Sequence, residues 1–399
     1  MEITKITDPH FDAVVVGGGM VGSVQALALL EQGKRVLLLE RQLPSVDWLA
    51  KPPLRVSAIN LFSQDYLEQL GVWAHIALGS KNVFKRLATW DKPMSRLEFN
   101  ADEIEHDHLG HLIRNEAIQL AGFDALKPYV QSAQLMLSDA ALNRIETRDR
   151  DVCLHLSDPS GEISVSATLL IGADGANSKV RQLAHIGTSG WDYQQHCLSI
   201  TIKTDFGPQD ITWQEFQPSG PKAFLPLADG YASLIWYDAP NNIKQLKTLP
   251  DTVLKTKIIE TFPDLPGDFV VVQHASFPLT RRQAKRYFSG RIVLVGDAAH
   301  TINPLAGQGV NLGFKDVAEL SSILKAVDWN DSEKIRQALV TYQQKRKLES
   351  CVMSGVMDLC YQLFSNSGAL RQTFRNQFLS LANQSRWAKV QVLKKAVGL

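Results

Sequence analysis

Apolar and polar positions along the first 40 residues predict a strand, a helix and a second strand. Residues 11–17 (FDAVVVG) form a short run of strand-forming residues, and residues 23–33 (SVQALALLEQG) are rich in helix formers and end on a glycine. Residues 34–40 (KRVLLLE) are largely apolar, as in a strand that is buried on both faces. The pattern therefore predicts a βαβ unit.

Further apolar runs extend this α/β pattern along the chain. Residues 167–174 (ATLLIGAD) and 291–297 (RIVLVGD) each predict a strand that ends in an aspartate. Helical spacing follows the second run and predicts a helix with one face on the sheet, at Val310, Phe314, Val317, Leu320 and Leu324. Residues 186–280 instead show alternating, aromatic-rich strands between turns, which predict an inserted antiparallel sheet. Residues 334–399 are predicted to be mostly helical.

Composition narrows the class of protein. The 399 residues are 45% hydrophobic and 21% charged, which excludes a disordered chain. The four cysteines (Cys153, Cys197, Cys351 and Cys360) form no CxxC pair, so we expect free thiols in a reducing compartment. The N-terminus shows no signal-peptide pattern, and no run has the ~18 apolar residues of a membrane span. We therefore expect a cytoplasmic protein.

Charge is placed unevenly along the chain. The net charge of +1 argues against a nucleic-acid partner. After Asp358, however, there are no acidic residues and six basic ones: Arg371, Arg375, Arg386, Lys389, Lys394 and Lys395. Three interpretations of this tail stay open: a solvated final helix, contact with an acidic partner, and peripheral contact with an anionic membrane such as the inner membrane.

A glycine fingerprint lies between the first strand and the first helix. Gly17, Gly19 and Gly22 form the GxGxxG pattern, in which the glycines allow a tight turn, close approach to a pyrophosphate and close helix–strand packing. The helix N-terminus then offers free N–H groups to the phosphates. Glu40, at the end of the second strand, can accept hydrogen bonds from ribose hydroxyls. The fingerprint predicts a dinucleotide but does not separate NAD from FAD.

Two later motifs favour FAD. The first is GADGANSKVR, with Asp174 at a strand end, and the second is GDAAH, with Gly296 and Asp297 at another. Asp297 suits the hydroxyls of a ribityl chain at the carboxyl edge of a parallel sheet. The second motif continues through Pro304, Gly307, Gln308, Gly309 and Asn311. The backbone amides of the Gly307–Gly309 turn could contact the flavin ring where negative charge gathers on reduction.

Together these motifs resemble the FAD-dependent aromatic hydroxylases of the para-hydroxybenzoate hydroxylase class. Within that class the chain is most similar to the ubiquinone-biosynthesis hydroxylases, in segments such as TWQEFQPSGPKAFLPL and AGQGVNLG. The resemblance runs nearly end to end. It implies that Arg55 lies near the flavin phosphates or ring and that Pro304 belongs to the surroundings of the ring. His300 would either shuttle a proton or hold the loop through a hydrogen bond.

The resemblance also implies a reaction. NAD(P)H would reduce FAD, O2 would add to flavin C4a as a hydroperoxide, and its distal oxygen would pass to the ring of a polyprenylated benzoquinol. The resemblance does not distinguish NADH from NADPH. It also leaves open which ring position is hydroxylated, the oligomeric state, and whether the chain contacts other ubiquinone-biosynthesis proteins. Alternatives are a sister hydroxylase acting at another ring position, a non-oxygenating flavin reductase of the same fold, and a flavoprotein scaffold of a membrane complex.

The expected fold is mixed α/β, with a Rossmann-like FAD-binding domain, an inserted antiparallel-sheet substrate domain and a helical C-terminus. The FAD-binding domain would comprise residues 1–75, 105–185 and 281–345. The substrate domain would comprise residues 76–104 and 186–280, and the C-terminal region residues 346–399.

The substrate pocket is expected between the inserted sheet and the flavin. Its candidate walls are Trp213, Phe224, Leu225, Pro226 and Trp236. Aromatic residues on strands are more often simply core, and this alternative stays open. The acidic and histidine-rich residues 103–111 invite a metal interpretation, but the chemistry needs no metal and we expect a polar surface loop.

Overall fold

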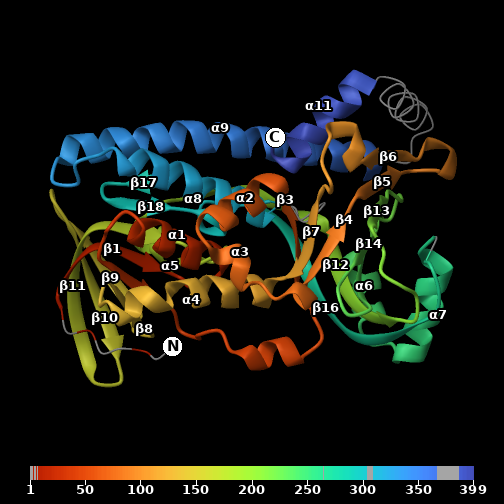
Figure 1. The fold of residues 1–399 in the computed structure, drawn as a ribbon, viewed down its shortest axis with the longest axis horizontal. Coiled ribbons are helices and arrows are strands. Elements are labelled where there is room, and N and C mark those ends of the chain that lie inside the picture. The colour runs from red at the N-terminus through yellow and green to blue at the C-terminus, as the bar shows by residue number, and fades with distance from the viewer. Residues whose placement is uncertain (1–2, 4–5, 7, 264, 303–308, 366–385) are drawn as a thin grey trace.

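A largely parallel eight-stranded sheet contains the N-terminal βαβ unit (Figure 1). The structure is a computed structural model that describes the chain apart from residues 1–2, 4–5, 7, 264, 303–308 and 366–385. Along the sheet the strands are β17 (Phe288–Ser289), β18 (Ile292–Leu294), β11 (Gly161–Gly172), β1 (His10–Val16), β2 (Val36–Leu39) and β8 (Leu135–Ser138). A hairpin of β9 (Ala141–Thr147) and β10 (Val152–Asp158) extends from β11.

The four predicted apolar runs became β1, β2, β11 and β18, which pair in parallel. Their central apolar side chains, at residues 13–15, 36–39, 169–171 and 292–294, are at most 4% exposed because helices cover the sheet. The helices of this part are α1 (Met20–Leu30), α4 (Asn115–Gln131), α5 (Lys179–Leu183) and α8 (Gly309–Lys325). Helix α8 carries the predicted apolar stripe, in which Phe314, Val317, Leu320 and Leu324 are 0% exposed. The predicted mixed α/β fold class is thus confirmed.

The second eight-stranded sheet is mainly antiparallel. Its order is β19 (His300–Thr301), β16 (Phe269–Ala284), β12 (Thr188–Thr204), β15 (Tyr231–Asp238), β14 (Lys222–Pro226), β13 (Ile211–Glu215), β5 (Arg86–Trp90) and β6 (Leu97–Asn100). One face carries α6 (Pro240–Leu246) and α7 (Asp251–Thr261), and a cluster of apolar side chains lies between these helices and the sheet. We call this sheet the substrate sheet, after the role expected from the sequence for the inserted antiparallel sheet.

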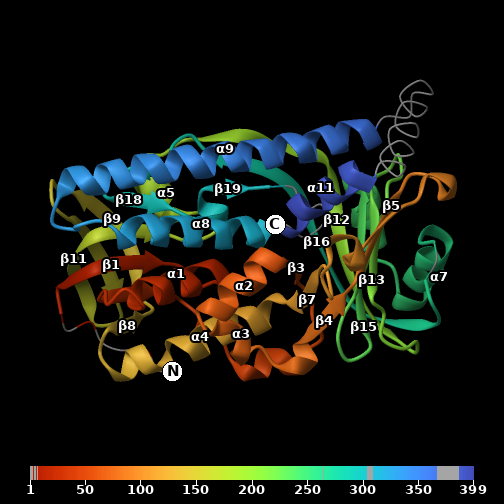
Figure 2. The same ribbon diagram turned by 45° about the horizontal axis from the view of Figure 1, so that its top comes forward.

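A small sheet lies between the two large ones in both views (Figures 1 and 2). It pairs β3 (Val56–Asn60), β7 (Gly110–Arg114) and β4 (Lys81–Phe84), and the short helices α2 (Leu61–Gln69) and α3 (Val72–His75) follow β3 in the chain. Single 3-10 turns lie at Val46–Ala50, Leu78–Ser80, Pro93–Ser95, Ala101–Ile104 and Gly296–Ala298.

The long helix α9 (Ser332–Ser365) runs along one side of the molecule (Figure 2). It is continuous across residues 345 and 346, so the expected boundary of the C-terminal region falls inside a helix. Helix α11 (Arg386–Val397) buries Leu393 and Val397 in a core that includes β6 and β7 side chains, while Lys394 and Lys395 stay exposed. None of the helices in the described part of the chain combines the length and apolar character of a membrane span.

Candidate functional site

The three fingerprint glycines meet different surroundings in the turn between β1 and α1. Gly17 has φ +99°, and a Cβ there would lie 2.6 Å from the Ala173 carbonyl oxygen. A Cβ on Gly22 would lie 1.8 Å from the Gly17 carbonyl oxygen, so α1 can pack on the turn only with glycine. Around Gly19, by contrast, no atom lies within 4 Å of a Cβ position. Gly17 and Gly22 therefore serve packing, and Gly19 leaves open space at the helix N-terminus, where a phosphate fits.

Two carboxylates lie beside this turn at strand ends. Glu40 accepts hydrogen bonds from the Gly18 N–H at 2.6 Å and from the Gln42 N–H at 3.0 Å. Asp174 Oδ2 accepts from the Lys179 and Val180 N–H groups at 2.6 and 3.0 Å and so caps α5. Asp174 Oδ1 is buried without a partner among the described residues. Both side chains thus have local structural contacts, and each retains acceptor capacity.

A cavity of about 560 Å³ opens next to Gly19. Its size is in the range of small-molecule sites. The loop before β3 forms one wall, and the start of α4 forms another; the lining includes Trp48, Arg55, Arg114, Asn115, Gln119 and Gln273. Arg55 is exposed. A guanidinium in a cavity beside free helix N–H groups suits an anionic diphosphate.

Asp297 lies in the turn after β18. Its side chain is exposed on one side, but surrounding protein desolvates it. This desolvation raises the pKa of Asp297, while His300 and Arg55 act in the opposite direction. The attraction to Arg55 links the Asp297 turn electrostatically to the cavity that Arg55 lines.

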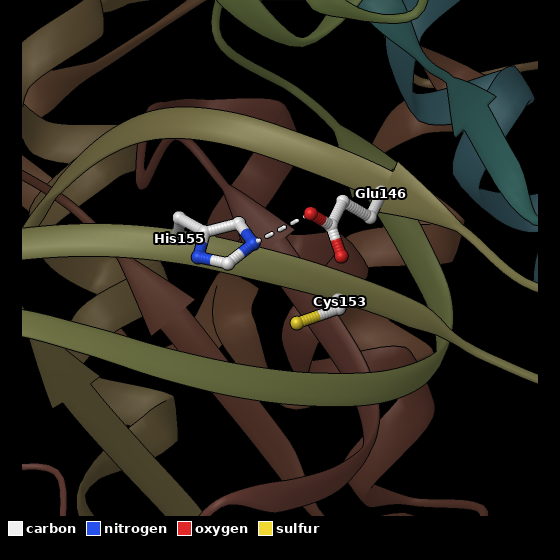
Figure 3. Close-up of side chains that lie close together, drawn as sticks. All are labelled: Glu146, Cys153 and His155. Carbon is white, nitrogen blue, oxygen red and sulfur yellow. Dashed lines mark ion pairs between the residues drawn. The ribbon is translucent and has the colours of Figure 1, made fainter.

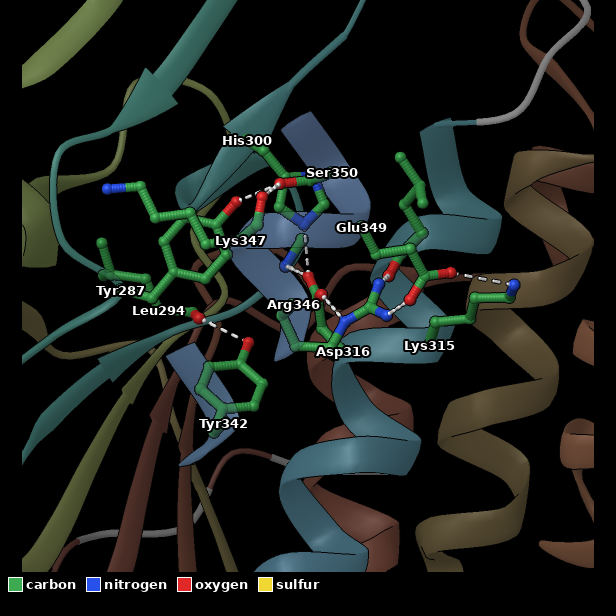
Figure 4. A network of polar contacts seen from close by, with 12 residues as sticks. Tyr287, Leu294, His300, Lys315, Asp316, Tyr342, Arg346, Lys347, Glu349 and Ser350 are labelled. Atoms are coloured by element: carbon green, nitrogen blue, oxygen red, sulfur yellow. Dashed lines mark hydrogen bonds and ion pairs between the residues drawn. The ribbon is translucent and has the colours of Figure 1, made fainter. Parts of the chain in front are cut away.

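His300 belongs to a buried network that ties the Asp297 turn to α8 and α9 (Figure 4). His300 Nε2 lies 2.6 Å from Asp316 Oδ2, and the Gly296 N–H donates to the same oxygen at 2.9 Å. Arg346 Nε donates to Asp316 Oδ1 at 2.7 Å. Burial alone would lower the pKa of His300 and raise that of Asp316, but the attraction between the two groups reverses both shifts. Arg346 adds to the lowering at Asp316 and opposes the rise at His300. This geometry favours the loop-holding role of His300 over a proton shuttle.

Comparison with known proteins identifies the cofactor. A family model described as an FAD binding domain matches residues 10–351. The chain belongs to this FAD-binding family. A curated relative, 3-demethoxyubiquinol 3-hydroxylase of Escherichia coli (strain K12), is 39% identical over 99% of this chain and 100% of that protein. Ubiquinone biosynthesis monooxygenase COQ6 of Rattus norvegicus is 30% identical over 97% of this chain and 91% of that one. The resemblance to ubiquinone-biosynthesis hydroxylases is therefore confirmed, and FAD is the cofactor.

Solved structures support the fold of this FAD-binding family member. p-Nitrophenol 4-monooxygenase PnpA from Pseudomonas putida DLL-E4 matches with a TM-score of 0.79 at 19% identity and covers 97% of this chain and 98% of that one. An aklavinone-11 hydroxylase, solved as a ternary complex with FAD and aklavinone, matches with a TM-score of 0.66 at 21% identity over 88% of this chain and 68% of that one.

The remaining expected FAD ligands follow the Asp297 turn. Asn311 is buried, and its side chain links α8 to β3: Nδ2 donates to the Ala58 carbonyl at 2.8 Å, and Oδ1 accepts from the Asn60 N–H at 3.2 Å. Gly309 begins α8 and has open space at its Cβ position. Pro304, Gly307 and Gln308 lie outside the described residues.

Three of the residues expected to line the substrate pocket lie in the hydrophobic core, which is the alternative that the sequence left open. Trp213, Phe224 and Trp236 are at most 5% exposed and pack against Phe262 and the helices α6 and α7. The Trp213 and Phe224 rings lie 5.8 Å apart within this core. Pro226 follows Phe224 at strand spacing and shares its face. Of the five expected wall residues, only Leu225 lies on the opposite face of the substrate sheet.

That opposite face carries residues that the sequence prediction missed. Along β12, Leu198, Ile200 and Ile202 enter the core under α6 and α7, whereas Ser199 and Thr201 point the other way. Both hydroxyls donate to carbonyls of the loop that lines the cavity, as does the Gln273 amide. Alternation in the segment LSITIK was the signal that could have found them.

A group of possible metal ligands lies away from the FAD site, on the hairpin of β9 and β10 (Figure 3). Glu146, Cys153 and His155 face one another there, with His155 Nε2 at 3.3 Å from a Glu146 oxygen. Glu146 also forms ion pairs with Arg144 and Arg148, so its charge is already neutralised. These contacts argue against a cation site.

The histidine-rich residues 103–111 gather no group of three ligand atoms among the described residues. His108 Nε2 lies 2.8 Å from the Gln64 Oε1, and Glu103 pairs with Lys389. Burial, together with the neighbouring His108 and Lys81, lowers the pKa of His111 to about 4, so this ring is neutral at physiological pH.

Proposed function

We propose that this chain is a flavin-dependent monooxygenase that hydroxylates the ring of a polyprenylated benzoquinol in ubiquinone biosynthesis, with NAD(P)H and O2 as co-substrates. The observation that carries this proposal is the match to 3-demethoxyubiquinol 3-hydroxylase, which spans both chains almost completely. Because the match covers the full length of that relative, it includes the substrate sheet as well as the FAD site.

The described residues fit FAD. The open space at Gly19 and the α1 N-terminus would receive the diphosphate, with Arg55 opposite, and Glu40 would accept from the adenosine ribose. Asp297 would hold the ribityl hydroxyls, and the site would be completed by Asp174, Gly296, Pro304, Gly307, Gln308, Gly309 and Asn311. Bound FAD supplies the redox chemistry and the activation of O2.

The chain itself must position the quinol ring and keep water out. We assign residues 76–104 and 186–280 to substrate binding and residues 1–75, 105–185 and 281–345 to FAD. The face of the substrate sheet opposite α6 and α7 would form the pocket wall, with Leu225 and Ile235 as apolar contacts beside Ser233. His300, fixed by Asp316, would hold the turn that carries Asp297.

We further propose peripheral contact with the inner membrane on its cytoplasmic side through the basic end of the chain. Helix α11 is anchored by Leu393 and Val397, which leaves Lys394 and Lys395 free to face anionic headgroups. Substitution of both lysines by glutamate should weaken binding to anionic liposomes and leave the fold intact, because both side chains are exposed. Equal liposome binding by this variant would exclude the contact.

The experiment that tests the function is a product assay with labelled O2. Purified holoenzyme, NAD(P)H and a short-tailed demethoxy-ubiquinol analogue should yield a product with one ¹⁸O atom at the vacant ring carbon. Label at another carbon would identify a sister hydroxylase, and NAD(P)H oxidation that gives only peroxide would favour a non-oxygenating flavoprotein. Asp297→Ala is the control and should lower FAD occupancy and product together.

A further inference from the structure

The segment Trp48–Arg55, which we call the strap, runs between the FAD cavity and the substrate sheet. Its residues Trp48, Lys51, Pro52, Leu54 and Arg55 line the cavity. On the side of the FAD domain, Arg114 binds three of its carbonyls: Nη1 donates to Leu49 at 2.9 Å, and Nη2 donates to Trp48 and Lys51, each at 2.8 Å. The first half of the strap is therefore held by a single guanidinium.

The second half is held by the substrate sheet. Three consecutive carbonyls each accept one side-chain hydrogen bond: Pro52 from Gln273 at 2.7 Å, Pro53 from Thr201 at 2.5 Å and Leu54 from Ser199 at 3.3 Å. Prolines lack an N–H and have a fixed φ, so the carbonyls are the polar groups through which this stiff stretch can be held.

The three donors share one face of the sheet. Thr201 and Gln273 are direct partners across β12 and β16, and Ser199 precedes Thr201 by two residues. Thr201 is 0% exposed and Ser199 6%, so their bonds are shielded from water. Each donor therefore contributes to one continuous attachment rather than to an isolated surface contact.

The strap ends at Arg55, the cation of the cavity. The Arg55 carbonyl accepts from the Asn115 N–H at 3.0 Å, which fixes its backbone, while its side chain is exposed toward the cavity. The hydrogen bonds to the strap carbonyls, from the FAD domain on one side and the substrate sheet on the other, thus fix the backbone from which the Arg55 guanidinium extends.

We propose that Ser199, Thr201 and Gln273 are positioning residues that hold the strap and thereby the Arg55 guanidinium against bound FAD, so that cofactor retention depends on the substrate sheet. The inference rests on the FAD site described above and on Arg55 as a ligand of FAD. It requires no particular quinol substrate.

The test compares two identical substitutions in the same sheet. Thr201→Val removes the hydroxyl that binds Pro53 and keeps the shape of the side chain. Thr212→Val is the matched control, because the buried Thr212 hydroxyl donates to the Phe224 carbonyl at 2.9 Å and does not touch the strap. FAD release from each holoenzyme is followed by flavin fluorescence after dilution, and the Kd by titration.

Thr201→Val should raise the Kd for FAD about 2- to 10-fold, the contribution of one buried hydrogen bond, and Thr201→Ser should restore it. Thr212→Val should leave the Kd within about 2-fold. Arg55→Ala should weaken binding about 10-fold or more, as expected for a charged donor, and adding Thr201→Val to Arg55→Ala should change nothing further.

Three results would overturn the proposal: equal effects of Thr201→Val and Thr212→Val, an undiminished Thr201→Val effect in the Arg55→Ala background, or unchanged FAD affinity in Arg55→Ala. Failure of rescue by Thr201→Ser would point to packing in place of the hydrogen bond and would also count against it. Because the readout is FAD binding, a failed product assay would not affect this outcome.

Discussion

The Arg346–Asp316 ion pair offers a sharp test of the network that supports the Asp297 turn. The two side chains are 4% and 0% exposed and lie 2.7 Å apart. Substitution Arg346→Met keeps an unbranched, apolar side chain in the helix but removes the guanidinium. Asp316 would then remain buried with only His300 and the Gly296 N–H as partners.

The expected cost is about 3 kcal/mol of unfolding free energy. Removing one partner of a buried ion pair typically costs 3–5 kcal/mol, since the other charge stays desolvated. We expect about the lower end because two partners of Asp316 remain and Glu349 keeps Lys315 at 3.1 Å. Arg336→Met is the matched control on the same helix: its pair with Glu333 is 59% and 57% exposed, and we expect at most about 1 kcal/mol.

The cost should also depend on pH. Burial would raise the pKa of Asp316, but His300 and Arg346 hold it below the ordinary value of 3.8. The stability that this carboxylate contributes is therefore present above pH 3.8 and is lost only in more acidic solution. Without Arg346 the pKa of Asp316 rises, and protonation then relieves the buried charge. The deficit of Arg346→Met should therefore shrink as the pH falls from about 7.5 toward 5.

Urea unfolding followed by circular dichroism measures both variants. The reasoning is refuted if Arg346→Met and Arg336→Met cost the same within about 0.5 kcal/mol. It is also refuted if Asp316→Asn and Arg346→Met are additive in the double variant, because residues of one network should show coupling.

Four further outcomes are expected. The pKa of His300 is raised, so its stabilisation is complete below about pH 6.5 and lost at higher pH; His300→Gln should flatten the unfolding free energy between about pH 6 and 9, and an unchanged slope would contradict this. Burial lowers the pKa of Lys222 to about 8, so the wild type should gain stability between about pH 8 and 10.5 and Lys222→Met should not, as urea titration at each pH would show. Gly22→Ala should disrupt folding because its Cβ would meet a carbonyl, whereas Gly19→Ala should keep the thermal midpoint of the apoprotein and weaken FAD binding. Phe224→Ala should lower the unfolding free energy by about 3–5 kcal/mol in urea while KM for the quinol stays unchanged. A raised KM in a stable variant would show that this ring contacts the substrate.

The parallel half of the fold was predictable because its strands are buried on both faces and so appear as continuous apolar runs. The runs at residues 11–17, 34–40, 167–174 and 291–297 all became neighbouring strands. The glycine turn was predictable for a related reason, since only glycine fits at positions 17 and 22. These features depend on local sequence and survive without knowledge of the tertiary contacts.

The small sheet of β3, β7 and β4 was not predicted, since its strands pair across 58 residues from Val56 to Arg114. The Asp316–Arg346 pair was missed for a similar reason. An aspartate within an amphipathic helix and an arginine in a charged one look like surface residues, and only the packing of α8 against α9 buries both.

The substrate sheet shows why the surroundings of a side chain are hard to predict even when its strand is recognised. Size drew attention to Trp213, Phe224 and Trp236, yet large rings are what a sheet needs to fill the space beneath two covering helices. The opposite face, which we propose borders the cofactor and the substrate, carries the smaller side chains of Ser199, Thr201 and Ser233. Neighbouring residues of a strand point to opposite faces of the sheet. The sequence therefore shows the alternation but not which set of side chains faces the helices. The packing of α6 and α7 against one face determines which set is buried in the core and which set faces the proposed pocket.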